Sequence, residues 1–298
     1  MTSIATVDLE AAFRSSGVGE VLDELDRQLV GLAPVKRRIR EIAALLLVDK
    51  LRRELGLTSR PPSLHMAFIG NPGTGKTTVA QRMAEILHRL GYVRTNRLVS
   101  VACEDLVGQP GGHTAPKTKE LLEKAMGGVL FVDQACHLDR PEDEPGHGKE
   151  AIEFLLQVME TKRDDLVVIL AGHPVRMERF FRADPGMRSR IAHHVEFPDY
   201  TKDELLAIAE LMLAEQNYRF SPEGRAAFAR YLDARMRQPH FANARSVRNA
   251  LDRARLRRAV RLFESHGKAL TVEDPQTIGP EEILASRVLA ASPGERAA

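Results

Sequence analysis

The chain lacks tryptophan, has few aromatic residues and carries almost no net charge. Its 298 residues include 11 Phe and 4 Tyr, so aromatic residues make up only 5% of the chain and do not suggest platforms for stacking nucleic-acid bases. The 43 basic and 41 acidic residues leave a formal net charge of +2, which excludes a global basic field. We therefore expect no membrane partner, and a nucleic-acid partner is disfavoured.

Cysteines and long apolar runs are also scarce. Cys103 and Cys136 are too few for a disulfide framework, and they favour a reducing, cytosol-like compartment. No apolar run reaches the roughly 18 residues of a membrane-spanning helix, and the N-terminal stretch lacks the pattern of a signal peptide. These absences predict a soluble protein of the cytoplasm, or of the plastid stroma if the source is an alga.

The hydrophobic pattern, in a chain that is 43% hydrophobic and 28% charged, is that of a globular protein with one large and one smaller domain. It divides the chain into five segments. We expect a flexible N-terminus over 1–20, an N-terminal helical linker over 21–63, an α/β domain over 64–200, a C-terminal helical domain over 201–290 and a disordered tail over 291–298.

Apolar strands alternate with amphipathic helices in the α/β segment. Strands are expected at 64–70, 97–103, 129–133, 166–172 and 191–197, and helices at 77–90, 114–126 and 148–160. This alternation predicts a parallel five-stranded sheet covered by helices on both faces. After FPDY at 197–200, the pattern is all-helical, with helices at about 201–215, 221–236, 242–266 and 280–289.

A glycine-rich loop carries the clearest chemistry. GNPGTGKTT, residues 70–78, matches G-x-x-x-x-G-K-[ST] and lies between an apolar strand and a helix, as the motif requires. In this motif glycines let backbone N–H groups surround phosphate oxygens, the lysine supplies a cation, and the hydroxyl after it binds magnesium. The predicted cofactors are ATP and Mg²⁺, and the predicted binding residues are Asn71, Pro72, Gly73, Thr74, Gly75, Lys76, Thr77 and Thr78.

An aspartate ends the strand VLFVD, residues 129–133. A carboxylate at the end of an apolar strand, downstream of a phosphate loop, is well placed to meet the magnesium shell. We therefore expect Asp133, together with Thr77, to serve the metal, with Asp133 acting through a water molecule.

With these motifs, the chain resembles the AAA+ ATPases, and more narrowly the red-type Rubisco activase, or CbbX, family. The resemblance extends from about Val21 to Leu289. It is carried by the runs LVGLAPVK, GNPGTGKTTVA, GHTAPKTKE, LLQVMETKRDDLVVILAG, PGMRSRIAHHVEFPDY and QPHFANARSVRNALDRARLR.

The resemblance implies a fold and a function. It implies an AAA+ P-loop domain followed by a helical lid, and subunits that form a hexameric ring with ATP between them. It implies ribulose 1,5-bisphosphate as an effector. It also implies remodelling of inhibited Rubisco, the Calvin-cycle carboxylase, by a pore loop that pulls on the tail of the Rubisco large subunit.

The resemblance also implies roles for single residues. Val30 and Gly31 occupy the positions that cradle adenine, and His173 occupies a sensor position after the fourth strand. Arg188 or Arg190, in GMRSRI, resembles the arginine finger that reaches a neighbour's γ-phosphate. Arg245, in NARS, resembles the sensor arginine of the lid.

Two positions depart from the family pattern. Gln134 stands where the family has a glutamate that activates water, and loss of a general base typically costs about 10²–10⁴ in rate. Pro110 and Gly111 stand where the pore loop carries an aromatic–aliphatic pair, which predicts a weakened grip on peptide. The alternatives are a non-catalytic, ATP-binding subunit in a mixed ring with a homologous partner, and, less favoured, a generic AAA+ assembly motor.

For three further groups of residues, a structural role is favoured over a functional one. Cys103 and Cys136 follow neighbouring strands and, with His113 and His137, form a conceivable metal or redox cluster, but their spacing matches no zinc pattern. Of His193 and His194, one is expected to be buried and the other exposed. The arginines of 245–261 suit an amphipathic lid helix better than a DNA-binding helix, and some of them could bind a sugar bisphosphate.

Overall fold

A computed structural model describes residues 8–57, 62–107, 114–139, 147–264, 271 and 273–290. The chain folds into two compact units. The first consists of residues 1–71 and 75–198, and the second of residues 72–74 and 199–298. The tip of the glycine-rich loop, residues 72–74, therefore belongs to the same unit as the C-terminal residues 199–298. No helix in the described ranges is long and apolar enough to cross a membrane.

Three helices open the first unit: α1 (Leu9–Ser16), α2 (Val18–Gln28) and α3 (Ala33–Glu54). The N-terminal segment over 1–20, for which no helix was predicted, contains α1 and the start of α2. The Asp8 side chain caps α1 by accepting hydrogen bonds from two backbone N–H groups, and Gly17 turns the chain into α2 with φ of 66°.

The connection between α2 and α3 interrupts the helical linker that the sequence predicts over 21–63. Gly31 and Leu32 both have positive φ, 62° and 53°. The Lys36 ammonium donates a hydrogen bond of 2.6 Å to the Leu29 carbonyl and so closes the end of α2. The break separates a short helix from a long one and leaves Gly31 in the connection between them.

The sheet of the first unit contains five parallel strands, in the order β2-β3-β4-β1-β5. The strands are β1 (Met66–Gly70), β2 (Leu98–Ala102), β3 (Val129–Asp133), β4 (Val167–Gly172) and β5 (His193–Phe197). The predicted fold class is confirmed. Every residue of β4 is buried, which explains why its sequence is apolar without alternation.

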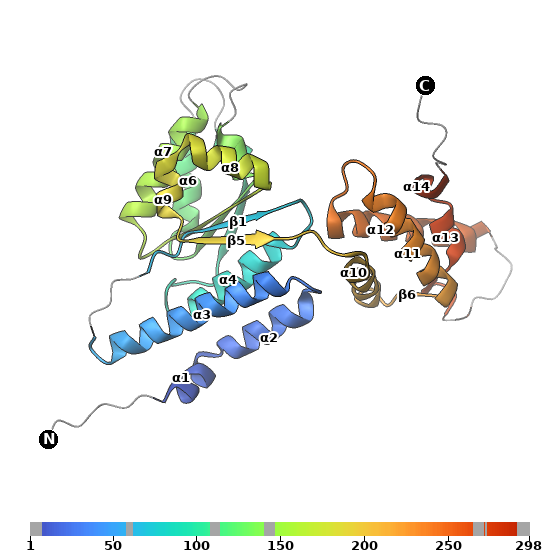
Figure 1. Ribbon diagram of the computed structural model, residues 1–298, viewed down its shortest axis with the longest axis horizontal. Coiled ribbons are helices and arrows are strands. Elements are labelled where there is room, and N and C mark those ends of the chain that lie inside the picture. The colour runs from blue at the N-terminus through green and yellow to red at the C-terminus, as the bar shows by residue number, and fades with distance from the viewer. Residues whose placement is uncertain are drawn as a thin grey trace. The chain divides into compact units, whose positions relative to one another are not determined.

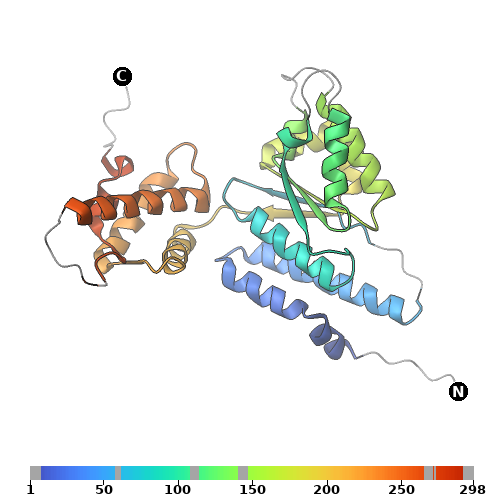
Figure 2. The same ribbon diagram turned by 180° about the vertical axis from the view of Figure 1, so that it is seen from behind.

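Helices cover both faces of this sheet (Figures 1 and 2). On one face lie α3 and α4 (Lys76–Arg89), and on the other lie α6 (Thr114–Ala125), α7 (His147–Thr161) and α8 (Pro174–Ala183). Three short helices were not predicted, because each has six residues or fewer: α5 (Cys103–Leu106), η1 (Ala135–Asp139) and α9 (Pro185–Arg190). The ten-residue α8 was also missed. The Asp184 side chain starts α9 by accepting from the Met187 N–H at 2.8 Å.

The second unit is helical, apart from one short pair of parallel strands that was not predicted. Its helices are α10 (Lys202–Ala214), α11 (Pro222–Met236), α12 (Asn243–Glu264), α13 (Pro280–Leu284) and α14 (Arg287–Ala290), and its strands are β6 (Arg219–Phe220) and β7 (Thr277–Ile278). A capping box between Thr201 and Glu204 fixes the start of α10 directly after FPDY.

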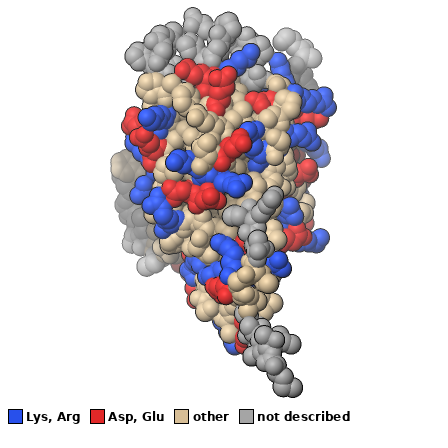
Figure 3. All heavy atoms as spheres, turned by 90° about the vertical axis from the view of Figure 1, so that its left-hand side faces the viewer, with Lys and Arg blue, Asp and Glu red and all other residues tan. Residues whose placement is uncertain are grey.

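Charged side chains of both signs are interspersed over the face shown in Figure 3. That face has no broad area of a single charge sign. A nucleic-acid backbone would need a broad area of positive charge.

A buried histidine in the first unit makes folding stability depend on pH. His65 is only 3% exposed; its Nδ1 accepts from the Val168 N–H at 3.1 Å, and its Nε2 lies 2.9 Å from the Met159 carbonyl. Nε2 therefore carries the proton, and a second proton on Nδ1 would oppose the Val168 N–H. Burial lowers the pKa of His65 from its ordinary 6.5.

We expect the melting temperature to fall as the pH drops below about 6.5. The His65 imidazole then binds a proton in the unfolded chain but not in the folded chain. A tenfold difference in proton affinity corresponds to about 1.4 kcal/mol. His65→Asn keeps an acceptor for Val168 and cannot titrate, so its melting temperature should change less than the wild type's between pH 8 and 5.5. Equal changes would show that other groups carry the effect.

Candidate functional site

The glycine-rich loop joins β1 to α4 and has the backbone conformation that the motif predicts. Gly73 and Gly75 have φ of 76° and 90°, which side-chain-bearing residues rarely adopt. Gly75 is the N-cap of α4, so the first N–H groups of this helix open toward the loop without partners inside the helix. A negatively charged group is favoured at such a helix start.

Lys76 and Thr77 begin α4 and differ in exposure. Lys76 is 9% exposed, and its ammonium donates to the carbonyls of Gly70 and Asn71, each at 2.8 Å. Thr77 is exposed. The buried ammonium inside the loop and the accessible hydroxyl beside it are the two groups that a nucleotide–magnesium complex requires here.

Asp133 ends β3 at the same edge of the sheet at which β1 ends, because all five strands are parallel. Its Oδ1 accepts a hydrogen bond of 3.0 Å from the backbone N–H of Gln134. Gln134 is exposed and has φ of 55°, so the chain turns sharply directly after the carboxylate. This turn presents the side chain at position 134 to solvent.

His173 follows β4 at the same edge of the sheet. It is the N-cap of α8 and is exposed, and its carbonyl accepts from the Met177 N–H at 2.8 Å. The parallel sheet therefore brings the glycine-rich loop, Asp133 and His173 to the carboxyl ends of three strands, where ligands bind in open α/β sheets.

The two candidate finger arginines lie on α9 in different environments. The Arg190 guanidinium donates to the Glu160 carboxylate at 2.5 Å and to the Gly186 carbonyl at 3.0 Å. Arg188 is exposed, and its guanidinium makes no hydrogen bond or ion pair with residues that the structure describes. Burial is the main effect that lowers the pKa of His194, and the positive charge of Arg188 lowers this pKa further. Arg190 thus fixes α9 to α7, whereas Arg188 can reach a partner.

Val30 and Gly31 are partly exposed in the α2–α3 connection. α2 is fixed to α4 near this connection, because the Arg82 guanidinium donates to Gln28 at 3.1 Å and to Glu24 at 2.7 Å. The connection is thereby held beside the helix that the glycine-rich loop opens.

Arg245 lies in the first turn of α12, in the second unit, and is exposed. Two residues near it were not predicted as site residues: Asn243 and Tyr200 both contact the tip of the glycine-rich loop. In the sequence, Tyr200 is recognisable only as part of the domain boundary FPDY, because no local pattern shows which residues contact the loop.

Several predicted features cannot be placed. Pro110, Gly111 and His113 lie outside the described residues. Cys103 and Cys136 are buried in the core of the first unit and form no disulfide. Among the described residues, no three His, Cys, Asp or Glu side chains are grouped to hold a metal. As expected, His193 is buried and His194 exposed.

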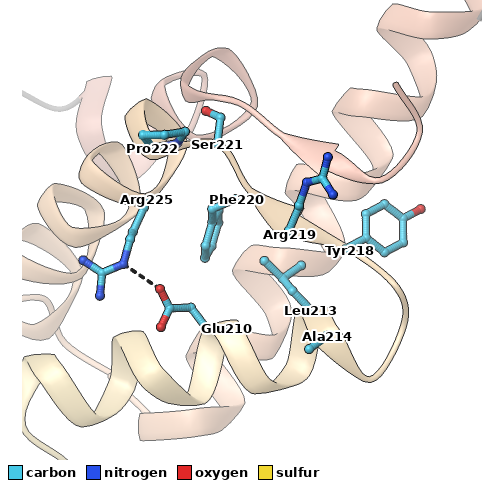
Figure 4. Close-up of a pocket in the computed structure, with 9 residues that line it drawn as sticks. All are labelled: Glu210, Leu213, Ala214, Tyr218, Arg219, Phe220, Ser221, Pro222 and Arg225. Atoms are coloured by element: carbon cyan, nitrogen blue, oxygen red, sulfur yellow. Dashed lines mark hydrogen bonds and ion pairs between the residues drawn. The ribbon is translucent and has the colours of Figure 1, made fainter. Parts of the chain in front are cut away.

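A separate cavity of about 420 Å³ lies in the second unit (Figure 4). Leu213 and Phe220 are among the residues that line it, and an ion pair of 2.6 Å joins Glu210 to Arg225 at its side. No residue predicted to bind nucleotide lines this cavity, so it is distinct from the candidate site.

Comparisons with known families identify two domains. The model described as "ATPase family associated with various cellular activities (AAA)" matches residues 66–199, and the model described as "AAA lid domain" matches residues 201–287. Two solved structures share the fold. A Thermotoga maritima RuvB mutant has a TM-score of 0.55 and 21% identity, covering 88% of this chain and 70% of its own. The FIGL-1 AAA domain has a TM-score of 0.59 and 18% identity, covering 86% and 80%.

Curated relatives match over nearly the whole chain. The chromosomal protein CbxX of Cupriavidus necator is 64% identical over 97% of this chain and 91% of its own length. The chloroplastic ribulose bisphosphate carboxylase/oxygenase activase of Cyanidioschyzon merolae is 60% identical over 96% and 98%. Protein CbbX of Cereibacter sphaeroides is 61% identical over 96% and 93%.

Proposed function

Because the chain belongs to the CbbX family of AAA ATPases, we propose that it binds ATP with magnesium at the glycine-rich loop and uses it to remodel inhibited Rubisco. The observation that carries this proposal is the 60% identity to a named Rubisco activase over 96% of this chain and 98% of the relative. Because the match covers nearly the full length of both chains, it covers both the α/β domain and the lid.

The residues at the carboxyl edge of the sheet fit a nucleotide–magnesium complex. The buried Lys76 ammonium and the left-handed glycines of the loop suit phosphate, and the exposed Thr77 hydroxyl and the Asp133 carboxylate suit magnesium. Bound magnesium would neutralise charge on the β- and γ-phosphates. Val30 and Gly31 would hold the adenine, and His173 and Arg245 would respond to the state of the phosphates.

Arg188 is the better candidate for the finger that completes a neighbouring subunit's site. Its guanidinium extends to solvent, whereas Arg190 is held by Glu160 and Gly186 within its own subunit. This assignment requires self-association into a ring, for which we propose a hexamer with ribulose 1,5-bisphosphate as effector and the tail of the Rubisco large subunit as substrate.

A second candidate function is that of an ATP-binding subunit with little hydrolytic activity of its own, in a ring with an active homologue. Gln134 favours it, because an amide positions water but does not accept its proton. Reactivation of Rubisco inhibited by a sugar phosphate separates the two. Activity of the purified chain alone supports the first, and activity only with a homologous partner supports the second.

Lys76→Ala should weaken ATP binding by about 10–100-fold in calorimetry with magnesium present. A hydrogen bond to a charged group is worth about 1.5–3 kcal/mol, and each 1.4 kcal/mol is tenfold in affinity. Lys119→Ala is the matched control, since Lys119 is 71% exposed on α6 and is not part of the candidate site. Unchanged affinity in Lys76→Ala would place the nucleotide elsewhere, and absence of binding by the wild type would reject the proposal.

A further inference from the structure

Asn243, the first residue of α12, is a buried polar side chain with a complete set of partners. It is 1% exposed and has φ of 45°. Its Nδ2 donates to the Pro72 carbonyl at 3.3 Å and to the Asp199 carboxylate at 2.8 Å, and its Oδ1 accepts from the Tyr200 N–H at 3.0 Å. One amide therefore joins the tip of the glycine-rich loop (72–74), the segment before α10 and the start of α12, all within the second unit.

Tyr200 holds the same loop at a second point. Its hydroxyl donates to the carbonyl of Thr74 at 3.3 Å, and both residues are buried. Burial raises the pKa of Tyr200 to about 12, so the hydroxyl keeps its proton at neutral pH and remains a donor.

Between these two points the loop touches the backbone of α12 directly. The Ala244 N–H donates to the Gly73 carbonyl at 3.2 Å. A Cβ atom added to Gly73 would lie 2.2 Å from the Ala242 carbonyl oxygen, so only glycine permits this approach. Three consecutive carbonyls, those of residues 72–74, are thus each bound by a donor from residues 200–244.

Holding these carbonyls fixes the direction of the N–H groups of the same peptide units. A trans peptide is planar, and its C=O and N–H point to opposite sides. The N–H groups of residues 73–75 therefore point away from the donors, and consecutive backbone N–H groups of this kind bind phosphate.

We propose that Asn243 and Tyr200 are positioning residues for nucleotide binding: they hold the peptide planes of the loop so that its N–H groups face the phosphates. This inference rests on the proposed ATP site. It also links the loop to α12, because Asn243 begins the helix whose first turn carries Arg245. A phosphate that fixes the loop would thereby fix the start of that helix.

Tyr200→Phe and Asn243→Ala test the proposal, with Ser246→Ala as the matched control. Ser246 is 7% exposed in the first turn of α12, and its hydroxyl accepts from the Ala242 N–H at 2.9 Å, so it supports the same turn without contacting the loop. Each protein is titrated calorimetrically with ADP and with ATP in excess magnesium, and its melting temperature is measured without nucleotide.

Tyr200→Phe should raise the Kd of both nucleotides about 2–10-fold, the range that one net hydrogen bond gives. Asn243→Ala should raise it more, whereas Ser246→Ala should leave it within about twofold whatever its melting temperature. A purely structural role would lower melting temperatures and leave the Kd of Tyr200→Phe unchanged, which overturns the inference even if Asn243→Ala does not fold. If the wild type binds neither nucleotide, the proposed site itself fails, and the inference with it.

Discussion

Gln134→Glu is expected to raise steady-state ATP hydrolysis by about 10²–10⁴-fold, the usual contribution of a general base. The amide of Gln134 can orient water but has no lone pair basic enough to take its proton, whereas a carboxylate at the same position can. Phosphate release by the purified chain, measured at saturating ATP and magnesium, gives the ratio of the two rates directly.

The geometry around position 134 allows the Gln134→Glu substitution. Gln134 is exposed, so a glutamate there loses little hydration, and it has the same length and the same backbone requirement at φ of 55°. Asp133, which we assign to magnesium, is anchored by its bond to the backbone N–H at 134, and this bond does not depend on the side chain. The Kd of ATP should therefore remain within about twofold of the wild-type value.

Gln134→Ala is the control, because it removes the amide without adding a base and should not raise the rate. If the wild type hydrolyses ATP as fast as Gln134→Glu, then another group must take the proton. Asp139 and the acidic residues at 142–144 follow Gln134 closely in the sequence and are the candidates for a substitute carboxylate. Equal rates would also remove the main argument for a non-catalytic subunit.

The sheet and its edge could be predicted from the sequence because their determinants are local. β3 and β4 are apolar over almost their whole length, so the strands appear as short hydrophobic runs between turn residues. The glycine-rich loop is equally local, since its left-handed glycines and its lysine lie within a few residues of one another. Parallel pairing then places Asp133 and His173 at the same edge without further information.

Contacts between distant residues could not be predicted in this way. Asn243 meets Pro72 across 171 positions of sequence, and nothing around either residue indicates the other. The break between α2 and α3 was missed for a related reason. Leu32 has φ of 53° with its side chain buried, and the Lys36–Leu29 hydrogen bond closes the connection, so the break depends on contacts that no local pattern shows.

The two arginines of GMRSRI show the same limit at the candidate site. Their sequence context is nearly identical, and from it either could be the finger. The difference comes from Glu160, 30 positions away on α7, whose carboxylate pairs with Arg190. Only the packing of α7 against α9 separates an arginine that fixes its own helix from one that extends to solvent.

Arg188→Ala, made in the Gln134→Glu background so that the starting rate is measurable, should lower hydrolysis by about 10³–10⁵-fold, as loss of an arginine finger does in other nucleotide hydrolases. Arg190→Ala in the same background should lower the melting temperature, because it removes the ion pair with Glu160 and the bond to Gly186, and should change the rate much less. Both are compared by phosphate release and thermal unfolding.

Mixing two inactive variants separates a finger that acts across an interface from one that acts within its own subunit. A subunit with Arg188→Ala keeps its loop, and a subunit with Lys76→Ala keeps its finger. In an equal mixture, roughly a quarter of the head-to-tail interfaces combine an intact loop with an intact neighbouring finger, so activity should return to that fraction. A finger acting within its own subunit gives no recovery, because no subunit then holds both groups. If Arg190→Ala instead abolishes turnover while Arg188→Ala does not, the ion pair with Glu160 must break in the ring, and the assignment is reversed.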